Sequence, residues 1–230
     1  SGNYILRIYD EYQDLVFSRK FIVYEGLSTV PTQIKRLRNL AYINTKQSVE
    51  FEVNPISIQL NNPKNTIKTL IIQNNNLHTS ISDLKPQYTI GSKLIFKYDE
   101  ESSFWGGNEY LFFENKEIRA ANVNVRSFNL YDIYHNYLYS DYPRINRSYT
   151  YNPDINGGFL TTALNADDTD IEADYVNIHF SLKNDAPKPG ESIYVVGGFN
   201  NYSMLPEYKM IYSRSSDSHK LELKLKQGFY

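Results

Sequence analysis

The sequence predicts an all-β fold built from small β-sandwich domains, and three observations support this prediction. Tyrosine occurs 21 times and phenylalanine 12 times among 230 residues, and aromatic residues are favoured on the pleated, half-buried surface of a sheet. Apolar and polar residues alternate repeatedly along the chain, as expected for strands with one solvated face. Asparagine, which suits turns, is frequent, whereas the only segment that suggests a helix is Ile81–Leu84.

The first 25 residues predict two strands, at 4–9 and 15–24, joined by the polar connection 10–14. An isolated hairpin is only marginally stable in water. We therefore expect these strands to belong to a larger sheet, either one completed by later strands or that of an N-terminal β domain. Our assignment treats residues 1–25 as the closing strands of a truncated N-terminal β domain.

A central β-sandwich domain is predicted over residues 26–165. Its clearest strand contains Val49, Phe51 and Val53, which alternate with glutamates. Val123 and Val125 are expected to share one face of a later strand, and residues 105–109 are expected to form a tight turn. Further strands are predicted at 56–60, 66–73, 94–98, 110–113 and 122–128.

A tyrosine-rich segment follows at residues 131–151. One interpretation is an amphipathic strand at a sheet edge, with rings half buried and hydroxyls in water. The other is an exposed contact surface, because tyrosine is enriched at protein interfaces. The candidate partner contacts are Tyr131, Tyr134, Tyr137, Tyr139 and Tyr142.

The acidic run at 167–174 predicts a domain junction, and a last sandwich domain is predicted over residues 172–230. Its strands are expected at 176–182, 193–196, 210–212 and 221–225. Within the acidic run, carboxylates recur every second residue and would share one face of an extended segment. A calcium site is disfavoured because the run lacks the central glycine of an EF-hand loop, and a solvated linker is the preferred interpretation.

Composition and motifs argue against several functional classes. A net charge of -2 gives no basic excess of the kind expected for nucleic-acid or anionic-membrane binding, and no apolar run is long enough to span a bilayer. Cysteine is absent, which excludes disulfides and thiolate chemistry. Common catalytic motifs are also missing. The four histidines are far apart in sequence, so we expect no metal, no cofactor and no enzymatic activity, with His179 a surface residue.

Several segments, in order, resemble those of one family: SGNYILRIYD, VFSRKFIVYE, VEFEV, IIQNNN, FWGGNEYLFFENKEIR, DINGGF, EADYVNIHFSL, IYVVGGFN and LKQGFY. They look like the plug protein of the type IX secretion system of Bacteroidetes. The resemblance implies two or three immunoglobulin-like sandwiches in tandem, the terminal ones incomplete. It also implies a non-enzymatic periplasmic subunit at the inner face of the outer membrane, which seals the large translocon barrel without inserting into the membrane.

A second resemblance covers residues 175–230 only. The segment IYVVGGFNNYS is similar to the immunoglobulin-like modules of glycogen-binding proteins and isoamylases, in which this turn lies beside a sugar face. It implies glycan binding as an alternative function, on surface or storage glycans. The competing interpretation is a structural turn with a core phenylalanine. The candidate glycan contacts are Phe199, Asn200, Asn201 and Tyr202.

Overall fold

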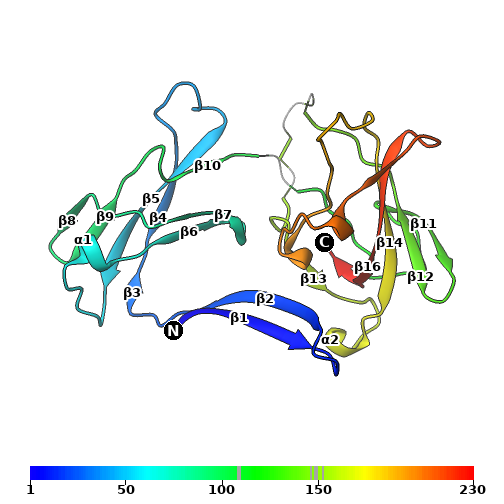
Figure 1. Ribbon diagram of the computed structural model, residues 1–230, viewed down its shortest axis with the longest axis horizontal. Coiled ribbons are helices and arrows are strands. Elements are labelled where there is room, and N and C mark those ends of the chain that lie inside the picture. Colours follow the sequence, from blue (N-terminus) through cyan, green and yellow to red (C-terminus); the bar gives the residue numbers. More distant parts are fainter. Residues whose placement is uncertain (108–109, 146, 148–149, 152) are drawn as a thin grey trace. The chain divides into compact units, whose positions relative to one another are not determined.

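The structure is a computed structural model that describes residues 1–107, 110–145, 147, 150–151 and 153–230. The chain divides into two compact units. Unit 1 comprises residues 1–73 and 77–107, and unit 2 comprises residues 74–76 and the chain that follows residue 107. Strands dominate both units, as Figure 1 shows. Among the described residues there are two α-helices, α1 (Pro63–Thr66) and α2 (Thr169–Glu172), each four residues long. The all-β sandwich fold is confirmed.

A six-stranded sheet forms the body of unit 1, and its longest strand is β5 (Lys46–Pro55). Every pairing in this sheet is antiparallel. Gln47 of β5 is the register partner of both Arg36 and Phe104, so β5 has neighbours along both edges. The other strands are β3 (Ser28–Thr29), β4 (Thr32–Arg36), β8 (Tyr88–Ile90), β9 (Lys93–Phe96) and β10 (Ser103–Trp105).

The core of unit 1 lies on the apolar face of β5. The Phe51 and Phe96 rings stack with centroids 4.3 Å apart, and Ile71 packs against this cluster. Ile71 belongs to the hairpin of β6 (Leu70–Gln73) and β7 (Asn76–Ser82). The core therefore joins two layers, which is the arrangement of a sandwich.

Three local predictions for unit 1 were wrong. The suggested helix at 81–84 is contradicted, because strand β7 continues to Ser82. The strand predicted at 56–60 is not formed, because β5 ends at Pro55 and the following residues bend away. The strand predicted at 66–73 begins only at Leu70, because Thr66 is the last residue of α1 and residues 67–69 lie in neither element.

The polar face of β5 is not fully solvated, since Glu50 is buried. Its carboxylate lies 2.6 Å from Lys35 Nζ and 3.4 Å from Arg38 Nη2. A buried carboxylate is tolerated when cationic partners compensate its lost hydration. The alternation in β5 predicts the strand correctly. It does not predict that Glu50 is buried, because the cations that pair with its carboxylate lie outside that strand.

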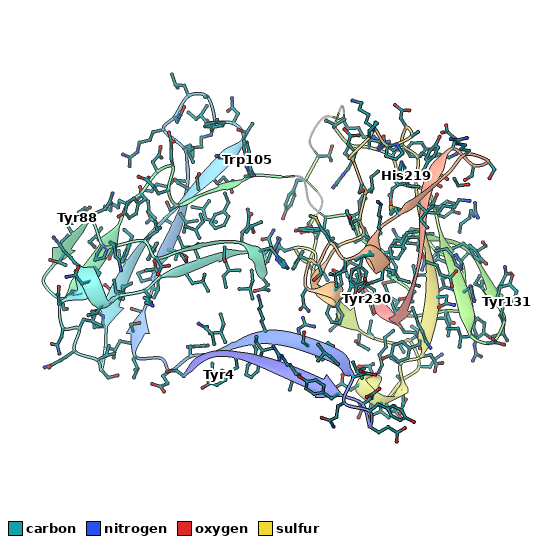
Figure 2. The ribbon with its side chains drawn as sticks, in the orientation of Figure 1. Tyr4, Tyr88, Trp105, Tyr131, His219 and Tyr230 are labelled. Carbon is teal, nitrogen blue, oxygen red and sulfur yellow. The ribbon has the colours of Figure 1, made fainter. Side chains whose placement is uncertain are left out.

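The N-terminal strands β1 (Gly2–Tyr9) and β2 (Leu15–Val23) form a two-stranded hairpin. Among the described strands they pair only with each other. One face of the hairpin carries apolar side chains that remain about half exposed: Tyr4, Leu6, Ile8, Phe17, Phe21 and Val23. Tyr4 is labelled in Figure 2. A hairpin with such a face requires a covering surface to be stable.

The main sheet of unit 2 has five strands in the order β11-β12-β14-β16-β15. Strands β12 and β14 are parallel, and all other neighbours are antiparallel. The strands are β11 (Val125–Leu130), β12 (Tyr134–Leu138), β14 (Tyr175–Leu182), β15 (Ile211–Ser213) and β16 (Ser218–Lys226).

A second layer covers the inner face of this sheet. It contains β13 (Leu160–Thr161), β17 (Gly228–Phe229) and the segment 113–115, which pairs with β17 through backbone hydrogen bonds. The shared core includes Val125, Val176 and Ile178, all fully buried, with Phe113 and Tyr230 from the second layer. Unit 2 is therefore a two-layer sandwich.

The structure divides the chain differently from the predicted boundaries. Strands β11 and β12, assigned by sequence to the central domain over 26–165, share one sheet with β14 and β16 from the predicted domain over 172–230. The boundary between compact units lies near residue 107 instead. The acidic run is not a domain junction, because it lies within unit 2 and contains the short helix α2. Asp168 caps this helix by accepting a hydrogen bond from the Asp170 backbone N–H.

Other details of unit 2 also differ from expectation. Val123 is 87% exposed whereas Val125 is fully buried, so these valines do not share a face. Residues 193–196 form no strand and contribute one isolated bridge between Tyr194 and Lys209. Part of the predicted turn at 105–109 lies outside the described residues. Within the part of the chain that the structure describes, no helix has the length and apolar character needed to cross a bilayer.

Candidate interaction surfaces

The five candidate contact tyrosines do not form one cluster. Tyr131 lies in the β11–β12 turn, where Figure 2 shows it at the end of the hairpin, and it is 62% exposed. Tyr139 and Tyr142 follow β12 at its other end and are also exposed. Tyr134 and Tyr137 lie within β12 and are half buried. Of the five, only Tyr131, Tyr139 and Tyr142 are available as exposed anchors.

Strand β12 is an interior strand, so the predicted edge position of the tyrosine-rich segment is wrong. Tyr134 faces inward and packs against the core of unit 2. Tyr137 faces outward, and its ring stacks on the His179 imidazole with centroids 4.1 Å apart. These two rings therefore have partners within unit 2.

The edge of this sheet is instead formed by β11. Phe128 and Leu130 of β11 are 39% and 60% exposed, and both lie on the inner face, opposite Asn136 and Tyr134 of β12. Tyr131, in the turn, is exposed as well, but its ring packs edge-on against His135 on the outer face, with centroids 4.9 Å apart. We call these three exposed residues at the end of the β11–β12 hairpin, two on the inner face and one in the turn, the rim patch. The other edge of β11 pairs with no strand among the described residues. An unpaired, apolar edge is suited to contact with another protein.

The outer face of the same sheet brings together two histidines that are 44 residues apart in sequence. His135 Nδ1 lies 2.8 Å from His179 Nε2, and the Asn177 amide nitrogen lies 3.1 Å from His135 Nε2. Glu222 Oε2 lies 3.6 Å from His179 Nδ1. Burial lowers the pKa of His179 below its ordinary value, and His135 adds to this effect, whereas Glu222 opposes it.

Sequence spacing missed this cluster because three separate strands supply its members. The alternation in β14 places His179 on the polar face, as expected. The parallel pairing of β12 with β14, which no local pattern reveals, brings His135 beside it. The remaining described histidines lie elsewhere, and the buried His219 ring contacts the Asp185 carbonyl oxygen through Nε2 at 3.0 Å.

The candidate glycan contacts form a structural turn. Asn200 is buried, and its Oδ1 accepts a hydrogen bond from the Gly197 backbone N–H at 2.9 Å. Tyr202 is also buried, and its hydroxyl donates to the Asn156 carbonyl oxygen at 2.9 Å. Phe199 packs against the core of unit 2, and Asn201 alone is exposed. The geometry thus matches the structural interpretation, since neither aromatic ring among these four residues is exposed to stack on a sugar.

Three of the segments that carry the family resemblance meet at this turn. Gly198 N–H donates to the Gly157 carbonyl oxygen at 2.6 Å. Gly157 has φ +70, and a Cβ at that position would lie 2.7 Å from the Tyr110 ring. Residues from the segments at 104–119, 154–159 and 193–200 therefore pack together and fix the second layer of unit 2.

Beside this turn, unit 2 contains an open cavity of about 390 Å³. Its walls are mainly apolar, and Asp141 and Arg144 lie among the lining residues. Burial raises the pKa of the Asp141 carboxyl above its ordinary value, while Arg144 opposes the shift. The main apolar lining residues are Phe112, Leu138, Phe180, Ile193, Met210 and Tyr230.

Comparison with known proteins finds similarity to a solved structure. No protein-family model matches the chain, and no curated protein is significantly similar to it. The chain resembles the crystal structure of a hypothetical protein from Parabacteroides merdae, with a TM-score of 0.89 and 27% sequence identity. The match covers the whole chain and 58% of that protein, so the chain spans little more than half of its relative.

Proposed function

We propose that this chain is part of a non-enzymatic periplasmic subunit that seals the outer-membrane translocon of a type IX secretion system. The ordered sequence segments that resemble the plug family suggest this partner and location. The chemistry required is modest, because closing a channel needs a folded body with an adhesive surface and no reacting groups. The proposed contact is with the translocon barrel, at the inner face of the outer membrane.

The observation that carries this proposal is the rim patch. Phe128, Leu130 and Tyr131 expose apolar and aromatic surface beside the unpaired edge of β11. Buried aromatic anchors dominate the energy of many protein interfaces, and an unpaired strand edge offers backbone donors and acceptors to a β-structured partner. A closed barrel has no free strand edge within its wall, so the backbone groups available to pair with β11 are those of the turns at its periplasmic mouth.

Site-specific photo-crosslinking in the native envelope tests this proposal. A photo-reactive phenylalanine at Leu130 of the full-length protein is expected to yield an adduct with the barrel. The same photo-reactive phenylalanine placed at Leu40, which lies in unit 1 and is 83% exposed, is a matched control for crosslinks that arise from random collision. An equal yield of the barrel adduct at both positions would argue against the rim patch as the contact.

A genetic experiment tests the role of the rim patch separately from the proposed function of the whole protein. The double variant Leu130→Asp/Tyr131→Ala is expected to reduce co-purification of the barrel and to increase leakage of small antibiotics into cells. Normal far-UV circular dichroism of the purified variant would show that it still folds. The proposed function itself fails if the wild-type protein never co-purifies with the barrel and its deletion leaves permeability unchanged.

A further inference from the structure

The outer face of the unit 2 sheet carries a group of possible metal ligands built on three adjacent strands. Tyr137 of β12 and Glu222 of β16 are both register partners of His179 in β14, and His135 lies two residues before Tyr137. The side chains of His135, His179 and Glu222 therefore project from the same face. One ligand atom from each of the three residues lies within 4.8 Å of the others. A site placed on paired strands is held more rigidly than one placed on loops.

We propose that His135, His179 and Glu222 bind a divalent transition-metal ion of the Zn²⁺ type, with water in the remaining positions. Two imidazoles and a carboxylate are a donor set that suits zinc, copper and nickel. Calcium and magnesium prefer sets composed of oxygen ligands. The side chains of His135 and His179 are partly accessible and Glu222 is exposed, so an ion can reach the site from solvent.

The two histidine nitrogens are already close to the spacing that a shared metal ion requires. Metal–ligand bonds of about 2.0–2.2 Å in tetrahedral geometry place the ligand atoms about 3.3 Å apart. His135 Nδ1 and His179 Nε2 are 2.8 Å apart, so the two nitrogens need to separate by about half an ångström. Glu222 Oε2 lies nearest the other ring nitrogen of His179, 3.6 Å from Nδ1, so this exposed side chain has to rotate to reach the ion; its ligand oxygen is within 4.8 Å of a ligand nitrogen of each histidine.

Neighbouring residues are placed to orient the two rings. When His135 binds an ion through Nδ1, its Nε2 carries the proton and needs an acceptor. Turning the Asn177 amide by half a rotation places its oxygen where the nitrogen now lies, 3.1 Å from Nε2. Such outer hydrogen bonds typically raise metal affinity 10–100-fold. The ring of Tyr137, which stacks on the His179 imidazole, restricts rotation of that imidazole.

The competing explanation is a hydrogen bond between two neutral histidines with no ion. The two explanations differ in the response of the protein to added metal. Titration calorimetry of the 230-residue chain with ZnCl₂, after treatment with chelator, is expected to show one saturable site. Zn²⁺ should also raise the melting temperature, because an ion that binds only the folded state stabilises it. Removal of the ion with chelator should reverse the rise.

Variants identify the ligands. His179→Ala and His135→Ala are each expected to abolish the saturable site, and Asn177→Ala should weaken it by about 10–100-fold. Glu222→Gln should weaken binding while leaving the fold intact. His78→Gln is the matched control, because His78 lies in unit 1, and it should retain wild-type affinity. The visible spectrum of bound Co²⁺ would report nitrogen and oxygen ligation independently of affinity.

Two outcomes would overturn the proposal. One is the absence of any stoichiometric binding to the wild-type chain, which would leave the histidine hydrogen bond as the explanation. The other is unchanged Zn²⁺ affinity in both His135→Ala and His179→Ala when circular dichroism shows that they fold. Neither outcome bears on the crosslink expected at Leu130, which lies on the inner face of the sheet, away from the two histidines.

Discussion

Asn115 and Gly228 are joined by two hydrogen bonds in the second layer of unit 2. The backbone N–H of Asn115 donates to the Gly228 carbonyl oxygen at 2.9 Å, and the Gly228 N–H donates to Asn115 Oδ1 at 2.9 Å. Asn115 is fully buried. The side chain thereby completes the pairing of segment 113–115 with β17.

Replacement of Asn115 by Ala should therefore destabilise unit 2. The Gly228 N–H would remain buried without its acceptor, and such a loss costs about 1–3 kcal/mol. Urea unfolding followed by far-UV circular dichroism measures the change. Asn184→Ala, at an exposed position of the same unit, should change the free energy of unfolding by less than about 0.5 kcal/mol. Equal effects of the two variants would contradict the role assigned to Asn115.

Gly228→Ala should be more severe than an ordinary glycine replacement. A Cβ at Gly228 would lie 2.3 Å from the Leu160 carbonyl oxygen, so β13 and β17 would have to separate. Gly26→Ala is the control, because no atom lies within 4 Å of a Cβ at that position. We expect a cooperative unfolding transition at markedly lower urea for Gly228→Ala and near wild-type behaviour for Gly26→Ala. A wild-type midpoint for Gly228→Ala would show that the strands yield without cost.

Tyr202 should act as a core residue. Tyr202→Phe removes the hydroxyl, which lies 2.8 Å from the Asn74 carbonyl oxygen and 2.9 Å from the Asn156 carbonyl oxygen, and should cost about 1 kcal/mol. Tyr202→Ala also removes a buried ring and should cost about 3–5 kcal/mol. Chemical unfolding measures both values. A variant that lost sugar binding while retaining wild-type stability would instead support the glycan alternative.

The raised pKa of the Tyr230 hydroxyl leads us to expect a loss of stability at alkaline pH. Burial, the largest cause, and the nearby Tyr175 raise its pKa from 10.0 to about 12. Because the folded-state pKa is the higher one, the contribution is fully present below pH 10.0 and is lost as the pH rises to about 12. The loss is on the order of 2–3 kcal/mol. Unfolding free energies of wild type and Tyr230→Phe across this window should show a steeper decline for wild type, and parallel curves would contradict the shift.

The exposed face of the β1–β2 hairpin should bind hydrophobic dyes. In the double variant Ile8→Lys/Phe17→Glu, opposite charges replace two apolar register partners on that face. Fluorescence of an anilinonaphthalene sulfonate probe should fall strongly. Tyr12→Ala, in the connection between the strands, should change it little, although Tyr12 is 77% exposed. Unchanged dye binding in the double variant would place the main apolar surface elsewhere.

Local patterns in the sequence predicted individual strands well. The alternation in β14 and β16 gave both strands, because each has one solvated face and one buried face. Strand β5 was predicted for the same reason, although the burial of Glu50 was not, since Lys35 and Arg38 lie outside that strand. Short strands such as β13 and β17 were missed because two residues carry no detectable period.

Long-range pairing was not predictable from this one sequence. The partnership of β12 with β14 determines both the domain boundary and the histidine cluster, and it joins strands separated by an acidic run that resembles a linker. Similarly, the exposed or buried state of each tyrosine depends on what the second layer covers. The chemical character of each residue was evident in the sequence, whereas its neighbours were not.

The parallel pairing of β12 and β14 has a consequence for biosynthesis. The intervening chain must cross from one end of the sheet to the other before the two strands can align. Strand β16, which flanks β14 on its other edge, leaves the ribosome later still. The hairpin of β11 and β12 therefore lacks its neighbouring strands until β14 and β16 have been synthesised, and contacts between distant segments of this kind form slowly. Nascent chains that stop before residue 175 should be especially dependent on chaperones.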